Sequence, residues 1–184
     1  MTGETKHVCL LTGGPGSGKT TLIKKVLSRV RLNAGGFYTE EVRVQGVRQG
    51  FKIITLDGKI ATLAHINISS PYRVSKYGVD LKGLESLAVP AIRQAIRDRE
   101  LVVVDEIGKM ELFSSPFREA VMEAIQSGKP VLGTIMLKPH PWADGIKHHP
   151  AVEVLFVDQA SQDRVARQVL EFLQSCSDKN CRGS

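Results

Sequence analysis

The chain has 184 residues, a net charge of +6 and a pI near 9.3, with 42% hydrophobic and 24% charged residues. This length suits one globular domain, and the composition is ordinary for a soluble protein. No apolar run approaches the ~18 residues of a membrane span, and residues 1–7 lack the apolar core of a signal peptide, so we expect a cytoplasmic protein without membrane contact. Three cysteines argue against a disulfide framework. The scattered basic residues favour polyphosphate ligands, without specific nucleic-acid binding.

A phosphate-binding pattern follows the first predicted strand. The apolar run 8–11 predicts a strand over residues 7–12, and the apolar spacing of residues 18–31 predicts a helix. Between them, the pattern G-x-x-x-x-G-K-[ST] consists of Gly13, Gly14, Pro15, Gly16, Ser17, Gly18, Lys19 and Thr20. Glycines let backbone N–H groups point at phosphate oxygens, and the start of the helix adds the positive end of its dipole. We expect Lys19 to neutralise β/γ-phosphate charge and the Thr20 hydroxyl to coordinate Mg²⁺.

A second candidate segment ends in two carboxylates. Leu101, Val102, Val103 and Val104 form an apolar run typical of a strand buried on both faces of a parallel sheet, and Asp105 and Glu106 follow. Ligands in open α/β sheets gather at this end of the strands. We predict that Asp105 holds Mg²⁺ together with Thr20. Glu106 is predicted to be catalytic with Lys19, orienting and polarising an attacking water.

The pattern between these motifs predicts an antiparallel meander and a helical region. Three alternating runs, 36–44, 48–56 and 60–66, are separated by Gly-containing turns. The apolar spacing that follows, over residues 81–96, is helical, but Pro90 predicts a kink or two short helices. A further helix is predicted from Ser115, as its cap, to Gly128, which ends it.

The last third of the chain predicts a strand (130–136), a Pro/His-rich loop (138–150), a strand (152–157) and a helix (161–175). Thr134 lies near the end of the first of these strands. Its hydroxyl either senses the γ-phosphate or is a satisfied core group. We expect one domain over residues 1–176 and a mobile tail over 177–184.

Two segments carry a family resemblance. Residues 36–43 (GFYTEEVR) and 105–112 (DEIGKMEL) resemble signatures of the cancer-related nucleoside triphosphatase family and its thermophile relatives. The resemblance covers residues 6–136, with order and spacing preserved. It implies an α/β P-loop NTPase fold of the RecA/AAA-like type, with a mainly parallel sheet flanked by helices and a β-meander insertion. It also implies slow hydrolysis of ATP, GTP and other nucleoside triphosphates to diphosphate and phosphate.

The resemblance further implies nucleotide contacts from residues 13–20 and from residues 101–108, which add Ile107 and Gly108 to the apolar run and its carboxylates. It alone singles out Lys109, which either reaches the γ-phosphate or pairs with Glu111. Glu40 and Glu41 fall on opposite faces of a strand, so at most one faces the nucleotide. The alternative for both is surface charge on an edge strand.

Three functions compete, with a nucleoside-triphosphate hydrolase leading. A small-molecule or polynucleotide kinase usually needs an arginine-rich lid, and residues 138–150 contain no arginine. A nucleotide-gated RNA or protein remodelling factor needs a partner surface, and no pattern in the sequence identifies a protein partner. Arg73, Arg97 and Arg118 are the candidates for an arginine finger within the chain. None has a supporting pattern, so we expect slow intrinsic turnover.

Overall fold

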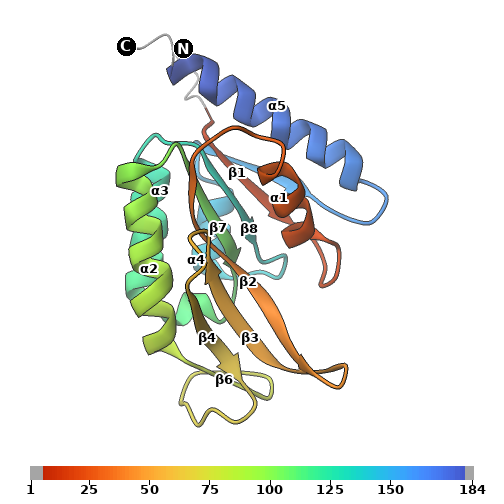
Figure 1. The fold of residues 1–184 in the computed structure, drawn as a ribbon, viewed down its shortest axis with the longest axis vertical. Helices are drawn as coiled ribbons and strands as arrows, with labels where there is room; N and C mark the ends of the chain where they lie inside the picture. Colours follow the sequence, from red (N-terminus) through yellow and green to blue (C-terminus); the bar gives the residue numbers. More distant parts are fainter. Residues whose placement is uncertain (1–5, 181–184) are drawn as a thin grey trace.

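The computed structural model describes residues 6–180, with side-chain surroundings for residues 6–176. These residues form a nine-stranded sheet with helices on both faces (Figure 1). The strands are β1 (Val8–Thr12), β2 (Ala34–Val44), β3 (Val47–Thr55), β4 (Ile60–His65), β5 (Arg73–Val74), β6 (Tyr77–Val79), β7 (Leu101–Ile107), β8 (Val131–Ile135) and β9 (Val152–Phe156). The helices are α1 (Lys19–Leu27), α2 (Leu81–Asp98), a short 3-10 helix (Glu111–Phe113), α3 (Ser115–Gln126), α4 (Pro141–Lys147) and α5 (Gln162–Asn180).

The strand order is β5-β6-β4-β3-β2-β7-β8-β1-β9. The five strands from β2 to β9 in this order are parallel, and the other four extend the sheet in antiparallel fashion. This confirms the predicted α/β fold with a meander insertion. Strand β8 lies between the two motif strands, because Val131 pairs with Val8 on one side and with Val102 on the other. The carboxyl ends of β1, β8 and β7 therefore meet at one edge.

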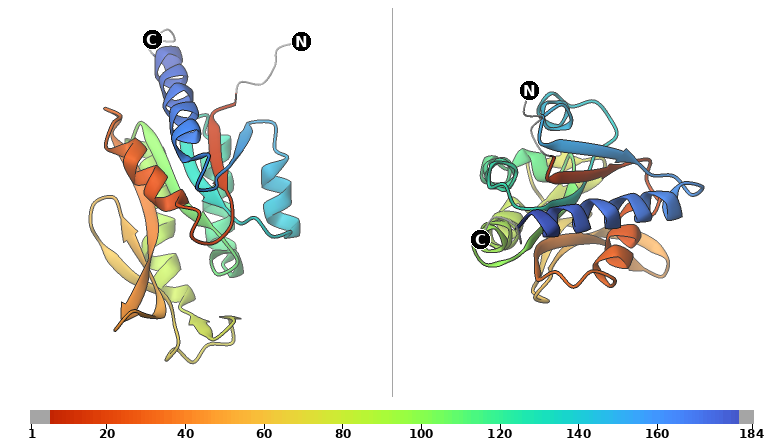
Figure 2. Two further views of the ribbon diagram at one scale, coloured as in Figure 1. Left: turned by 90° about the vertical axis from the view of Figure 1, so that its right-hand side faces the viewer. Right: turned by 90° about the horizontal axis from the view of Figure 1, so that it is seen from above.

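Two hydrophobic clusters hold the helices to opposite faces of the sheet. Helices α2, α3 and α4 pack on one face, and α1 and α5 pack on the other (Figure 2). Side chains alternate between the clusters along each central strand: Val102 and Val104 join the first, whereas Leu101 and Val103 join the second. Because helices cover both faces of the sheet, the sequence of β7 is a continuous apolar run up to Asp105. None of the helices within residues 6–180 combines the length and the apolar character needed to cross a bilayer.

Helix α2 corrects the alternative of two short helices separated at Pro90. It runs uninterrupted from Leu81 to Asp98, after the side chain of Asp80 accepts a hydrogen bond from the Gly83 N–H (2.9 Å) at its start. Pro90 lies on the exposed side of the helix. Solvent can therefore satisfy the Ser86 carbonyl that a proline at this position leaves without an N–H donor.

Other helix boundaries also differ from the sequence prediction. Ser114, not Ser115, caps α3, since its hydroxyl accepts from the Phe117 N–H at 3.1 Å. Helix α1 ends at Leu27, where the following Ser28 hydroxyl bonds back to the Lys25 carbonyl. The predicted loop 138–150 contains α4, whose first turn is closed by the Asp144 carboxylate accepting from the His140 N–H (3.0 Å).

At the carboxyl end, α5 continues to Asn180, beyond the predicted limit of 175. Residues 181–184 of the predicted mobile tail lie outside the described residues.

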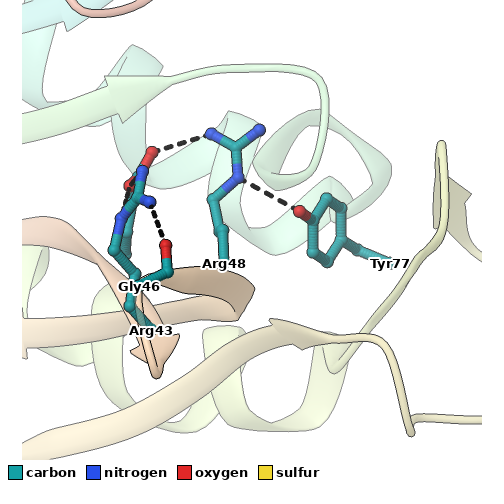
Figure 3. A network of polar contacts seen from close by, with 5 residues as sticks. Arg43, Gly46, Arg48 and Tyr77 are labelled. Carbon is teal, nitrogen blue, oxygen red and sulfur yellow. Dashed lines mark hydrogen bonds and ion pairs between the residues drawn. The ribbon is translucent and has the colours of Figure 1, made fainter.

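The meander is braced by polar contacts at the β2–β3 turn (Figure 3). Arg48 donates to the Glu41 carboxylate (2.7 Å) and to the Tyr77 hydroxyl (3.1 Å), which joins β3 to β6. Arg43 pairs with the same carboxylate and donates to the Gly46 carbonyl (2.8 Å). These contacts hold the antiparallel strands beside β2, on the side of the sheet away from β9.

Candidate active site

The phosphate-loop residues form a tight turn between β1 and α1. Gly16 and Gly18 have φ of 73° and 87°, in the left-handed region that glycine adopts without steric cost. Gly13 lies so close to the Val157 carbonyl that any Cβ there would clash. The three glycines are therefore required by the geometry of the loop, which explains the spacing found in the sequence.

Lys19 folds back over this loop. Its Nζ donates to the carbonyls of Gly13 (3.0 Å) and Gly14 (3.1 Å) and to the Ser17 hydroxyl (3.4 Å). An ammonium that holds three loop oxygens sits where the pattern places the charge of a phosphate. The structure thus places the Lys19 ammonium at the loop, and its contact with a nucleotide phosphate stays a prediction.

Asp105 lies near the carboxyl end of β7, across β8 from the loop. Its side chain is fully buried, and its Oδ1 accepts a hydrogen bond from the Thr134 hydroxyl at 2.6 Å. Its Oδ2 is a buried atom with no hydrogen-bond partner among the described residues. Thr134 therefore orients Asp105 and leaves one carboxylate oxygen open for another ligand.

Burial raises the pKa of Asp105, and four groups act in the opposite direction: the Thr134 hydroxyl, the Thr20 hydroxyl and the ammonium groups of Lys19 and Lys24. Thr20 follows Lys19 at the start of α1, so the loop places a hydroxyl and a cation beside this carboxyl. The phosphate loop and the end of β7 accordingly form one site, as the two motifs predicted.

Glu106 follows Asp105 and is half-buried. Burial raises the pKa of its carboxyl, the negative charge of Asp105 raises it further, and Lys19 lowers it. A carboxyl whose pKa is raised toward neutrality is suited to accept a proton during a reaction. By contrast, the side chains from Leu101 to Val104 are fully buried and have no contact with solvent, so they support the site by packing.

Glu111 supplies a second carboxyl next to Glu106. The sequence analysis named Glu111 but did not predict that it lies beside Glu106. It is buried, and a Cβ built on Gly108 would lie 2.8 Å from Glu106 Oε1 and 2.9 Å from Glu111 Oε2. Gly108 is thus the point at which the two carboxyls approach each other. Burial, followed by repulsion from Glu106, raises the pKa of Glu111 to about 8. Only the family signature could have drawn attention to this residue.

The other charged residues considered from the sequence lie away from these carboxyls. Lys109 is exposed, and no ion pair joins it to Glu111 in residues 6–176, which corrects that alternative. Glu40 pairs with Lys24 of α1 at 2.6 Å and with Lys52 at 3.3 Å. Both glutamates of β2 are therefore held in surface ion pairs, and the strand is not an edge, because β3 pairs with it.

None of the three candidate arginines contacts the loop. Arg73 donates to backbone carbonyls near β5, and Arg118 donates to the Ser115 hydroxyl on α3. Arg97 is exposed near the end of α2, at the opposite edge of the sheet from the site. The arrangement offers phosphate-binding amides, one lysine, an open carboxylate oxygen and a half-buried glutamate, which together suit phosphoryl transfer.

Sequence comparisons match most of the chain to one protein family. A sequence model of the family described as NTPase matches residues 8–170. The nucleoside-triphosphatase THEP1 of Thermotoga petrophila is 48% identical over 165 residues, covering 90% of this chain and 92% of that protein. The cancer-related nucleoside-triphosphatase homolog of Bos taurus is 40% identical, covering 92% and 97%.

Solved structures share the fold. THEP1 from Aquifex aeolicus superposes with a TM-score of 0.82 at 37% identity, covering 90% of this chain and 98% of that one. The solution structure of a human cancer-related nucleoside triphosphatase gives a TM-score of 0.78 at 38% identity, covering 93% and 98%. Together with the site geometry, these matches confirm the resemblance seen in the sequence: the chain belongs to the NTPase family, with the cancer-related and THEP1 nucleoside-triphosphatases among its relatives.

Proposed function

We propose that the protein is a nucleoside-triphosphatase that hydrolyses ATP, GTP and other nucleoside triphosphates to the diphosphate and phosphate. The observation that carries the proposal is the convergence of the phosphate loop with Asp105 and Glu106 at one edge of the sheet. The relatives named as nucleoside-triphosphatases support the same reaction class.

The residues present fit a magnesium ion. Asp105 Oδ2 is a buried acceptor without a partner among the described residues, and the Thr20 hydroxyl is the neighbouring oxygen donor. Hard cations such as Mg²⁺ prefer such oxygen ligands and keep several waters. Thr20 and Asp105 would hold the ion, and when bound it would supply positive charge to the triphosphate.

The chain's own residues account for the rest of the hydrolysis step. The loop amides and Lys19 bind the β- and γ-phosphates, and Glu106 accepts a proton from the attacking water. The water oxygen then forms a bond to the γ-phosphorus while the bond from that phosphorus to the bridging oxygen breaks. The electron pair leaves with the diphosphate. Because no candidate arginine reaches the site, we expect slow turnover by the isolated protein.

Product analysis tests this proposal. The protein is incubated with ATP, GTP, CTP or UTP and Mg²⁺, with and without RNA and candidate phosphate acceptors. Equal amounts of diphosphate and inorganic phosphate are expected with each triphosphate, whether or not an acceptor is present. A phosphorylated acceptor in place of free phosphate would overturn the proposal in favour of a kinase. A rate that depends on RNA would overturn it in favour of a remodelling factor.

A further inference from the structure

The segment between β9 and α5, residues 157–161, lies along the phosphate loop together with Gln162, the first residue of α5. The Val157 N–H donates to the Thr12 carbonyl at 2.7 Å, where β1 enters the loop. The Val157 carbonyl fills the space that a side chain at Gly13 would need. One residue therefore contacts the beginning of the loop from a segment that is distant in the sequence.

The same segment is fixed by an internal turn. The Ser161 N–H donates to Asp158 Oδ1 (2.8 Å), and the Asp158 N–H donates to the Ser161 hydroxyl (2.9 Å). Ser161 is buried and Asp158 is exposed, so this pair of hydrogen bonds ties the surface of the turn to the interior. The turn places the next residue, Gln162, at the start of α5 with little freedom.

Gln162 reaches the other end of the loop. Its Nε2 donates to the Ser17 carbonyl at 2.9 Å, and its side-chain amide occupies the space above Gly18 that any Cβ would need. The glycine at the start of α1 is favoured by its positive φ, and its missing side chain leaves room for this amide. The contact joins residues 145 positions apart in the sequence.

The direction of the Gly18 N–H follows from this contact. The peptide between Ser17 and Gly18 is trans, so its C=O and N–H groups point in opposite directions in one plane. Holding the carbonyl on one side therefore aims the amide hydrogen to the other side. A hydrogen bond to the carbonyl also polarises the N–H and strengthens it as a donor. In the phosphate-loop pattern, such loop amides cradle the α- and β-phosphates.

We propose that Gln162 is a positioning residue that aims and polarises the Gly18 N–H toward the nucleotide's phosphates. This inference rests on the proposed function of the loop as the phosphate site. It assigns to α5 a direct part in nucleotide affinity, through a side chain that does not itself touch the phosphates.

The test is ADP binding by isothermal titration calorimetry in the presence of Mg²⁺, with three full-length proteins. Gln162→Met keeps the length of the side chain but removes the donor. Asp163→Asn is the matched control, because it breaks the exposed Lys25–Asp163 ion pair (3.0 Å) between the same two helices. We expect Gln162→Met to bind ADP about five- to tenfold more weakly than the wild type, the size expected for one lost hydrogen bond. Asp163→Asn should stay within about twofold.

Steady-state kinetics and melting separate positioning from support of the fold. In Gln162→Met, KM for ATP should rise by a factor similar to the loss of ADP affinity, with kcat within about threefold, since the contact acts alike on ground and transition states. The melting temperature without nucleotide should match that of Asp163→Asn.

Wild-type ADP affinity in Gln162→Met would overturn the inference. An equal loss of affinity in both variants, or a loss accompanied by a lower melting temperature of Gln162→Met alone, would overturn it in favour of general packing between α1 and α5. Because ADP is not hydrolysed, the ADP-binding and melting results do not depend on whether the wild type proves to be a hydrolase.

Discussion

Replacing Glu111 with Gln is expected to stabilise the protein, and to do so more at pH 7 than at pH 5. Burial and the neighbouring Glu106 raise the pKa of Glu111 to about 8 in the folded protein, against about 4.3 in an unfolded chain. Between these values the unfolded chain binds fewer protons than the folded one. The free energy of unfolding therefore falls as pH rises from about 4.5 to about 8. Glutamine has nearly the same shape and carries no titrating proton.

The magnitude follows from the width of this window. Between pH 5 and pH 7 the wild type should lose about 2–3 kcal/mol at this residue, from about 1.4 kcal/mol per pH unit. Urea unfolding of both proteins at pH 5, 6 and 7 measures the difference. The Glu119→Gln variant, on the exposed side of α3, changes the net charge equally and serves as the control. A stability difference between Glu111→Gln and wild type that stays constant or shrinks from pH 5 to pH 7 would refute the reasoning.

Three further predictions concern the site. Lys19→Ala should weaken triphosphate binding and nearly abolish phosphate release, because the clustered phosphate charge loses its cation; unchanged hydrolysis would end the phosphate-loop assignment. Excess EDTA should stop turnover, and Mg²⁺ should restore it; full activity in EDTA would contradict a role for Thr20 and Asp105 as metal ligands. Thr134→Val should lower the free energy of unfolding by about 1–3 kcal/mol in urea, by removing the donor to buried Asp105. Thr134→Ser keeps the hydroxyl and should retain most of the wild-type free energy of unfolding. Equal losses in the Val and Ser variants would argue against a stabilising role for the hydrogen bond.

Local patterns in the sequence were sufficient to predict the two halves of the site. The glycines around Lys19 are dictated by backbone conformation within a few residues, and the apolar run before Asp105 reflects a strand covered on both faces. Strand β8 was predicted as a strand from its own apolar run, whereas its place between the motif strands is seen only in the structure. These features are readable because each depends on neighbours in the chain.

The features that could not be predicted depend on contacts between distant segments. The Gln162 contact with Ser17 spans 145 positions, and the Thr134 hydrogen bond to Asp105 spans 29. The burial of Glu111 depends on how the chain turns after β7, and the sequence analysis considered this residue only as a possible ion-pair partner of Lys109. Pro90 was misjudged for a similar reason, because the side of α2 that faces solvent decides whether a proline is tolerated.

The most direct test of the proposed hydrolase is the Glu106→Gln variant, with kcat and ATP affinity measured on one preparation. Gln keeps the shape of the side chain but cannot take up the proton of the attacking water, while Lys19, Thr20 and Asp105 remain. We predict that kcat for phosphate release falls by about 10²–10⁴-fold, the usual range for loss of a general base. Affinity for MgATP should change by less than about tenfold. A near-normal kcat would contradict the account by moving the base elsewhere, and loss of ATP binding together with the rate would instead make Glu106 a metal-binding or structural residue.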